Sequence, residues 1–369
     1  MSLQHPELVP VAFSQGFTLH DSYYAARQKG LRLRRSKVAA TGEVFLVRPS
    51  LVLPYWGAKT DEVEKALYWR QWGVPFAALA YVCGRDAMFY YRAWVSLGRT
   101  AVVGTTGKSA AKLPAHLLAD EKHTWRGGER HYVATTVGEG CFLGAAVVAE
   151  ASTEALQAGY GDFLTEARDL APEYEPETVG TEGWHATREA WQLLVPTVTL
   201  ILCFLPAVLK IEARGRGALR QQLRRRAWHV YQATTKAHFA QRVRRLREWA
   251  RGELEGAVQA TVLKLCELKA QFMIAYDFPA AARTTNGIDR LLDYQDRVLY
   301  AMRYLLGTQE SGRWAGRALA LQWNFPPYSA QAQRHGAKRS PFEALNGFHY
   351  HDNWLHNLLS AASMGGRRL

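Results

Sequence analysis

Cysteine is scarce in this chain of 369 residues, which has only four, and no two of them form a Cys-x-x-Cys pair. Their wide spacing argues against a thiolate zinc site and against a disulfide framework, so we expect a reducing compartment. The first residues also lack a basic segment followed by an apolar one, which is the pattern of a secretory signal. Together these absences predict a cytoplasmic protein.

Long hydrophobic runs are also few. The most membrane-like run, Leu193 to Leu209, has 17 residues and includes two prolines and two threonines, so it reaches only the short limit for a membrane span. We expect this run to hold a buried strand between turns, and we expect no membrane partner. The chain shows no internal repeat and no low-complexity segment.

Acidic residues are in deficit, because 33 Asp and Glu stand against 46 Lys and Arg, giving a net charge of +13. The stretch from Lys210 to Arg251 has thirteen basic residues and two glutamates, a net +11 in 42 residues. A second basic run, Arg27 to Lys37, adds six positive charges. Such patches fit a nucleic acid or a membrane surface. The alternative is that these basic residues form only the solvent-exposed faces of helices and bind no partner.

Three short helices are expected between Thr60 and Gly98, because helical spacing of apolar residues is interrupted at Gly73 and Gly84. A tight glycine turn between the second and third helix is typical of a helix-turn-helix. The third helix would carry residues suited to phosphates and base edges near its start: Arg85, Tyr90, Tyr91 and Arg92. An ordinary three-helix packing unit is the alternative.

The middle of the chain predicts an α/β fold. Strand patterns cover residues 116–125, 130–137 and 141–150, separated by glycine turns, and an amphipathic helix follows over 153–170. A short strand near 177–184, a helix over 185–194 and a buried strand over 197–205 come next. The order β-β-β-α-β-α-β predicts a mixed five-stranded sheet with flanking helices.

The remaining segments are expected to be helical. A basic helical insertion is predicted over residues 211–278, between the first part of the core (111–210) and its closing part. A long helix with one apolar stripe then runs to a capping Gly307. This closing helix and a helical tail make up residues 279–369, and residues 1–110 form the N-terminal, DNA-binding region.

This element order is that of a ribonuclease-H-like domain, in which the first strand, the fourth strand and the closing helix each bring one carboxylate to a common point. The corresponding acids here are Asp120, Glu182 and Asp289. Three carboxylates from distant segments suit two divalent ions about 4 Å apart, which activate the attacking oxygen and stabilise the leaving one. Magnesium, or manganese, fits because Mg²⁺ prefers oxygen ligands and keeps waters that a substrate displaces.

Each acid also has a structural alternative. Asp120 fits the end of a strand, and Glu182 fits a solvent-facing turn. Asp289 fits the N3 position of a capping box opened by Asn286. Glu121 is expected on the opposite side of its strand from Asp120. The run "AVVGTTGKSAAK" is not a phosphate-binding P-loop, because Val102 stands where the motif needs its first glycine.

The chain resembles the DDE-type transposases of prokaryotic insertion sequences, with a Mutator-like helical insertion. The likeness lies in "YWRQWGVPFAALAYVCGRD", "LADEKHTW", "VATTVGEGCFLGAA", "ILCFLPAVLKI", "RTTNGIDRL" and "LNGFHYHDNWLHNLLSAAS". It implies an N-terminal region that binds transposon ends and a core that cuts DNA and joins strands. Asp120 takes the place of the family's first metal-binding Asp, and Asp289 takes that of the third acid after the "TTN" signature.

Two positions depart from the family's pattern. Where the family typically has Asp-Gly-Trp after the fourth-strand Thr, this chain has Glu182 before Gly183 and Trp184. Related sequences have a Cys-x-x-His pair on the next strand. Here Cys203 is present, but Pro206 stands at the position of the histidine, three residues later. The alternative function is therefore a transposase-derived, sequence-specific DNA-binding protein that no longer cuts. A structural or RNA-binding protein using only its basic patches is a third possibility.

The expected partner is double-stranded DNA, both transposon ends and target, bound by a homodimer or higher oligomer because two ends must meet. Such a protein would associate with the nucleoid. The residues expected to contact DNA are Arg85, Tyr90, Arg92, Arg214, Arg216, Arg224, Arg225, Arg226, Arg244 and Arg245.

Overall fold

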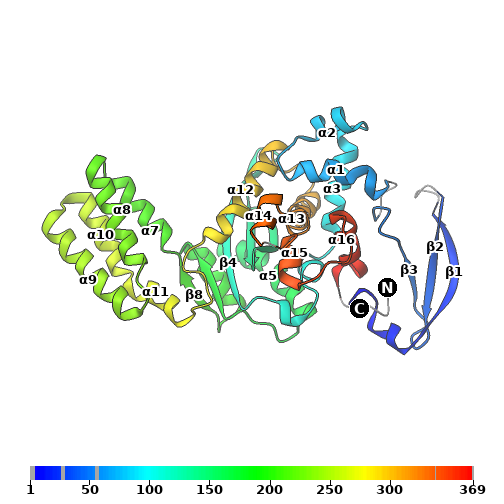
Figure 1. Ribbon diagram of the computed structural model, residues 1–369, viewed down its shortest axis with the longest axis horizontal. Coiled ribbons are helices and arrows are strands. Elements are labelled where there is room, and N and C mark those ends of the chain that lie inside the picture. Colours follow the sequence, from blue (N-terminus) through cyan, green and yellow to red (C-terminus); the bar gives the residue numbers. More distant parts are fainter. Residues whose placement is uncertain (1–4, 26–29, 55–57, 337, 368–369) are drawn as a thin grey trace. The chain divides into compact units, whose positions relative to one another are not determined.

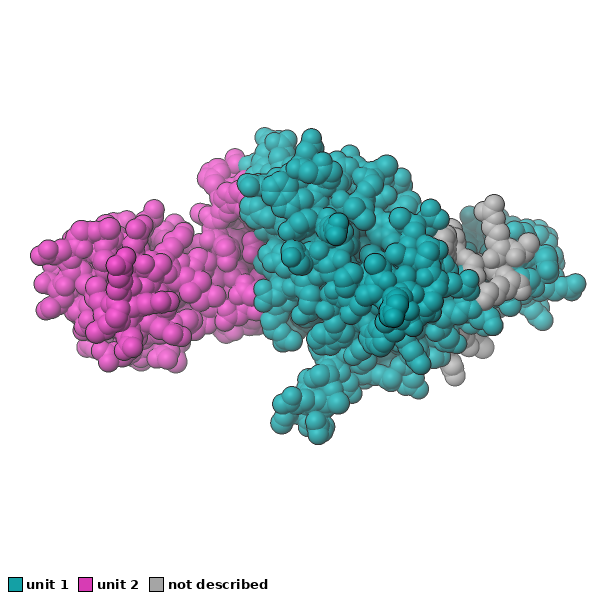
Figure 2. Space-filling view, turned by 90° about the horizontal axis from the view of Figure 1, so that it is seen from above, with its two compact units in different colours: residues 1–114, 121–174, 290–369 teal, residues 115–120, 175–289 magenta. Residues whose placement is uncertain are grey.

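The computed structural model describes residues 5–25, 30–54, 58–336 and 338–367. Arg27 and Lys29, which belong to the first basic run, lie outside these residues. The chain divides into two compact units, coloured separately in Figure 2. Unit 1 comprises residues 1–114, 121–174 and 290–369, and unit 2 comprises residues 115–120 and 175–289.

The central feature is a five-stranded mixed sheet in the order β6-β5-β4-β7-β8. Its strands are β4 (His116–Arg126), β5 (Glu129–Gly138), β6 (Cys141–Val148), β7 (Thr178–Thr181) and β8 (Thr199–Leu202). β5 and β6 pair antiparallel, whereas β7 runs parallel to both β4 and β8. The β4–β5 turn has Gly127 and Gly128 at φ of +59° and +85°, a backbone region that favours glycine. The predicted α/β class and mixed sheet are confirmed.

Two helices connect the later strands where the sequence predicted them: α5 (Thr153–Leu170) after β6 and α6 (His185–Leu194) between β7 and β8. Ser152 caps α5 by accepting a hydrogen bond from the Ala155 N–H. The inner side of α5 is apolar and includes Leu156 and Phe163, both buried. This side of α5 buries apolar surface against the sheet, so the hydrophobic spacing in the sequence determines which side of the helix points inward.

The basic insertion is helical and belongs to unit 2, where its helices gather in a bundle (Figure 1). They are α7 (Leu205–Arg214), α8 (Gly217–Tyr231), α9 (Lys236–Glu253), α10 (Gly256–Glu267), α11 (Lys269–Met273) and the short η6 (Ile274–Asp277). Their apolar faces form one core around Val208, Phe239, Val262 and Phe272. The basic residues lie on the outer faces of these helices.

The most membrane-like run of the sequence is divided between β8 and the start of α7, with Ile201 and Val208 buried. This confirms a strand within the run. Of the described part of the chain, no helix combines the length and the apolar character that crossing a bilayer requires.

The long closing helix α12 spans Asn286–Ala301 and ends before the predicted cap at Gly307. Arg303 and Tyr304 adopt φ of +55° and +70°, so the chain turns there. Gly307, at φ +79°, precedes the next helix instead. The C-terminal elements are α13 (Gln309–Asn324), α14 (Ala330–Arg334), α15 (Pro341–Asn346), α16 (Trp354–Ala361) and η7 (Ser363–Gly366).

The N-terminal region contains a separate three-stranded antiparallel sheet, β1 (Phe17–Ala25), β2 (Leu31–Val38) and β3 (Val44–Val47), which sequence patterns did not predict. Short η1 (Pro6–Leu8) and η2 (Val11–Gln15) precede it. β2 includes four of the six basic residues of the first basic run, Arg32, Arg34, Arg35 and Lys37. Apolar and basic side chains alternate irregularly along β2, which hid the strand in the sequence.

The three predicted helices are α1 (Thr60–Arg70), α2 (Phe76–Cys83) and α3 (Ala87–Ser96), followed by η4 (Leu97–Arg99), α4 (Val102–Thr106) and η5 (Ala110–Lys112). They pack onto the core of unit 1 rather than forming a separate body. Trp94 is fully buried and donates its indole N–H to the Gln322 Oε1 at 2.6 Å. Arg70 is likewise fully buried and donates to the Val298 carbonyl.

Candidate carboxylate site

The parallel pairing of β4 with β7 aligns two of the predicted acids. Leu117 pairs with Val179 and Leu118 pairs with Gly180, an offset of 62 residues. Continuing that offset by two residues brings Asp120 level with Glu182, which follows the end of β7. Neighbouring strands lie about 4.8 Å apart, and residues in register share a face of the sheet. The register therefore favours a shared position for these two carboxyl groups.

Leu118 marks the face of β4 on which Asp120 lies, because residues two apart on a strand point to the same side. Two glycines come close to Leu118 there. A Cβ added to Gly180 would lie 2.7 Å from Leu118 Cδ2, and one added to Gly287 would lie 3.1 Å from Leu118 Cδ1. The first turn of α12, which carries Asp289, thus packs against this face of β4 near Asp120.

A second contact shows the direction in which α12 runs. Lys122, again on the Asp120 face of β4, forms an ion pair with Asp296 of α12. The strand advances about 13 Å over the four residues from Leu118 to Lys122. The helix advances about 13.5 Å over the nine residues from Gly287 to Asp296. The two elements therefore run side by side in the same direction, and Asp120 lies level with the first turns of α12.

Glu182 and Asp289 interact electrostatically. The pKa of the Glu182 carboxyl is raised, first by partial desolvation and then by the negative charge of Asp289, whereas the Lys210 ammonium acts in the opposite direction. A like-charge pair of this kind favours a cation between its members. Lys210, on the exposed side of α7, is a neighbour of these acids that motif reasoning did not predict.

Cys203 links the end of β8 to the start of α12. Its Sγ accepts a hydrogen bond from the Thr285 N–H at 3.2 Å and lies 3.3 Å from the Thr285 Oγ1. The Asp289 N–H donates to the Thr285 carbonyl, so the helix starts one residue earlier than a capping box opened by Asn286 requires. The capping-box alternative for Asp289 does not fit this register. Cys203 and Thr285 instead fix the helix start from which Asp289 projects.

Pro206, the second departure from the family's pattern, stands in the first turn of α7. The missing N–H costs nothing there, because the first turn of a helix has no intrahelical acceptor for it. Proline at this position is therefore compatible with the local fold.

Glu121 lies on the opposite face of β4, as predicted. Its side chain is buried and accepts a hydrogen bond from the Tyr160 hydroxyl of α5. It supports the packing of α5 and does not face the other three acids.

The donor set of the site fits a hard divalent cation, because three carboxylates supply oxygen ligands and two of them repel each other. In this conformation, however, no three His, Cys, Asp or Glu side chains of the described residues are arranged to hold a metal ion together. Binding would thus require a side-chain rearrangement, for which the exposed Glu182 has the most freedom.

The residues expected to bind DNA divide by exposure. Arg85 and Arg92 are exposed, and Arg85 lies 3.7 Å from the Glu62 carboxylate. Tyr90 is 1% exposed and donates its hydroxyl to the Gly84 carbonyl at 2.8 Å. A DNA contact does not fit this position. The large ring of Tyr90 closes the turn between α2 and α3 instead.

In the insertion, the arginines expected to meet DNA are exposed with one exception: Arg214, Arg216, Arg224, Arg225, Arg244 and Arg245 are exposed, and Arg226 is half-buried. Arg226 stacks over the ring of Trp249 at 4.3 Å. Trp249 and Trp228 pack against the insertion core, whereas Trp184 is 44% exposed. Trp228 and Trp249 therefore serve core packing.

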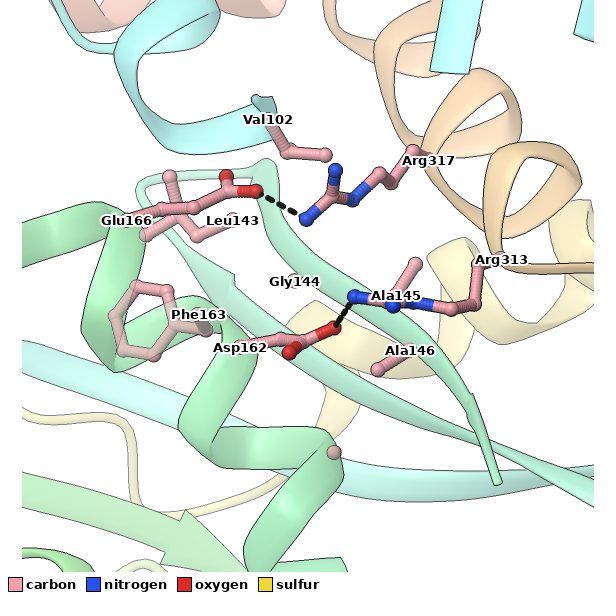
Figure 3. Close-up of a pocket in the computed structure, with 11 residues that line it drawn as sticks. Val102, Leu143, Gly144, Ala145, Ala146, Asp162, Phe163, Glu166, Arg313 and Arg317 are labelled. Atoms are coloured by element: carbon pink, nitrogen blue, oxygen red, sulfur yellow. Dashed lines mark hydrogen bonds and ion pairs between the residues drawn. The ribbon is translucent and has the colours of Figure 1, made fainter. Parts of the chain in front are cut away.

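A second group of charges lies in unit 1, around a small pocket between α5, β6 and α13 (Figure 3). The buried Glu166 pairs with Arg317 at 2.7 Å and also accepts a hydrogen bond from the Val103 N–H at 3.0 Å. One helical turn away, the more exposed Asp162 pairs with Arg313 at 3.1 Å. These charges neutralise each other, so we assign them to stability rather than to chemistry.

Replacing Glu182 by glutamine is expected to stabilise the protein at a pH of about 7. A raised pKa means that the folded chain holds the Glu182 proton more tightly than the unfolded chain does. The contribution of the Glu182 carboxyl to the free energy of unfolding is therefore fully present below its pKa in the unfolded chain, about 4.3. It is lost as the pH rises through its pKa in the folded chain. Glutamine cannot ionise, so thermal unfolding should show a higher midpoint at neutral pH and no difference near pH 3.

Two control variants accompany this measurement. The same substitution at the exposed Glu173 should change the midpoint at neither pH. In an Asp289→Asn background the gain from Glu182→Gln should shrink, because the neighbouring charge is gone. A gain that is unchanged by Asp289→Asn would show that the two carboxyl groups do not interact.

The candidate site therefore consists of Asp120 on β4, Glu182 after β7 and Asp289 in the first turn of α12, with Lys210 beside Glu182. Register, helix packing and charge interaction each bring a different pair of these segments together. No protein-family model matches the chain, and a search of curated proteins finds no match either.

Proposed function

We propose that the protein is a DDE-type transposase, which binds transposon-end DNA, cuts its strands and joins them to a target. The observation that carries this proposal is the pairing of β7 with β4 in the sheet, together with the packing of the first turn of α12 on the face of β4 around Leu118. This arrangement supports the placement of one acid from each segment on the same face of the sheet. Acids collected from distant segments serve reactions on phosphates.

The sheet order supports a ribonuclease-H-like core. Numbered along the chain within this sheet, the strands are ordered 3-2-1-4-5, with the second strand antiparallel to the third and the fourth and fifth running parallel. The closing helix lies on the face that carries the first acid.

The residues would divide the work as follows. Asp120, Asp289 and Glu182 would hold divalent ions, Mg²⁺ or Mn²⁺, and orient the attacking oxygen in line with the scissile phosphate. When bound, such ions lower the pKa of an attacking water or 3′-hydroxyl and stabilise the leaving oxygen. Cys203 and Thr285 would keep the start of α12 in place, because Asp289 projects from it.

The charge distribution supports DNA as the substrate. Exposed arginines cover the insertion helices, and β2 presents further basic side chains in the N-terminal sheet. Exposed cations neutralise backbone phosphates irrespective of sequence, so affinity should fall steeply with salt. Arg85, in the turn before α3, and Arg92, on the exposed side of α3, remain the residues proposed for DNA contact from the helix-turn-helix. A dimer on two DNA ends follows from the same proposal.

The test is strand cleavage of a labelled duplex that contains the DNA flanking this gene, in Mg²⁺ or Mn²⁺. We expect nicks at the element's ends that disappear with a chelator. Wild-type chain that binds these ends but leaves them intact in both metals would contradict the proposal.

A second candidate is a transposase-derived DNA-binding protein that no longer cuts, favoured by Glu182 in place of Asp and by the absence of a three-ligand arrangement among the described residues. Glu182→Asp with Pro206→His separates the two. Cleavage only by the double variant would establish this second function. Cleavage by the wild type would exclude it.

A further inference from the structure

A basic groove lies between α7 and α10 in unit 2. It has a volume of about 460 Å³ and is lined by Lys210, Ala213, Arg214, Ala260, Thr261 and Lys264. On α7 the lining residues are spaced three and four apart, and on α10 they lie within one turn, so each helix presents a single face. Ile211 of α7 and Val262 of α10 are buried in the same core cluster, so the two helices pack together there.

The composition of the groove selects an anion. Three of the six lining residues are cationic and none is acidic. Alanines form much of the remaining wall, which keeps the groove open between the long side chains. Thr261 donates its hydroxyl to the Ala257 carbonyl at 2.7 Å, so this group is engaged within its own helix. Recognition would therefore depend on charge, as expected for a phosphate backbone rather than for a particular base.

The groove lies close in the fold to the carboxylate site. Lys210 lines the groove from α7, which starts just after β8, and β8 pairs with β7, the strand that Glu182 follows. Arg214 and Lys264 extend the positive lining beyond Lys210. A polyanion held along these residues would reach the vicinity of the three acids with its charge already neutralised.

We propose that the groove lined by Lys210, Arg214 and Lys264 binds the phosphodiester backbone of a DNA strand and guides that strand to the carboxylate site. This inference rests on the proposed function for its substrate. It assigns a role to Lys264 and Lys210, and it makes the insertion a part of the substrate channel.

Binding of a fluorescent 30-base-pair duplex to the full-length chain at several salt concentrations tests the groove. The slope of log affinity against log salt is negative, and each lost phosphate contact reduces its magnitude by about 0.9. Lys210→Ala with Lys264→Ala should therefore reduce the magnitude of the slope by roughly 1.8. Lys112→Ala, at an exposed lysine of η5, serves as the matched control and should leave the slope unchanged. Circular dichroism checks that all variants are folded.

The outcomes separate this inference from the proposed function. If the double variant shows a reduced slope but the wild-type chain never cleaves DNA, the groove inference is supported and the transposase proposal is refuted. An unchanged slope, with cleavage intact, would refute the groove and keep the transposase. A loss confined to an RNA hairpin probe, with duplex DNA bound as before, would also overturn the inference.

Discussion

Replacing Asp120 by asparagine is expected to reduce metal-dependent strand cleavage by about a thousandfold or more. Asparagine keeps the size of the side chain but removes the charge that would hold a divalent ion. Such an ion stabilises the transition state by several kcal/mol, and about 1.4 kcal/mol corresponds to a factor of ten. Single-turnover cleavage of the end-containing duplex measures the rate, and salt-dependent binding of the same duplex should remain at the wild-type level.

A matched substitution keeps this prediction falsifiable. Asp169→Asn removes one exposed carboxylate from α5, outside β4. This variant should cleave at a rate within about twofold of the wild-type rate. A rate for Asp120→Asn close to that of Asp169→Asn would mean that Asp120 only marks the strand, and would remove it from the site.

Replacing Arg317 by methionine is expected to destabilise unit 1 by about 3–5 kcal/mol. Methionine retains the aliphatic contacts but leaves the buried Glu166 carboxylate without its cationic partner. A buried charge that loses its partner costs about this much, since the Val102 and Val103 N–H groups, which also donate to Glu166, cannot replace a cation. Urea unfolding at neutral pH measures the loss, using a signal from unit 1.

The neighbouring ion pair provides the control. Arg313→Met breaks the more exposed pair with Asp162, one turn away on the same two helices (Figure 3). A surface pair contributes about 0–1 kcal/mol, so the loss should be several times smaller. Equal losses for the two variants would show that burial does not distinguish the pairs.

Acid should partly rescue Arg317→Met. Burial raises the pKa of Glu166, and Arg317 is the main opposing influence, so the pKa rises further without it. A carboxyl with a raised pKa gives stability below its unfolded value of about 4.3 and loses it as pH rises through the folded value. The gap between variant and wild type should therefore narrow as the pH is lowered from about 7 toward 5.

Local hydrophobic periodicity explains why the core could be predicted from the sequence. The apolar spacing of Thr153–Leu170 and of His185–Leu194 fixed both helices at their observed bounds. The Gly127–Gly128 turn separated the first two strands. Because parallel and antiparallel connections follow from element order, the mixed sheet followed as well.

Where tertiary contacts decide the outcome, the sequence was less informative. Gly307 suggested a helix end, but Arg303 and Tyr304 turn the chain earlier. Tyr90 looked like a phosphate contact beside two arginines, yet its ring packs in the α2–α3 turn. The N-terminal sheet was missed because β1 is exposed along nearly its whole length and lacks an alternating apolar face.

The site shows the same division. Motif order identified Asp120, Glu182 and Asp289, but only the register of β4 with β7 and the packing of Gly287 on Leu118 relate their positions. Lys210 could not be assigned from sequence, because one lysine in a basic helix looks like any other. Its proximity to Glu182 depends on how α7 leaves the end of β8.

A crystal structure of the chain soaked with Mn²⁺, with anomalous diffraction recorded for the metal, tests the convergence of the three segments most directly. We expect an anomalous peak with carboxylate oxygens of both Asp120 and Asp289 at about 2.1–2.2 Å, and Glu182 nearby. Carboxyl groups of Asp120 and Asp289 more than about 10 Å apart, with no peak between them, would contradict the account, because no shared pair of ions spans that gap.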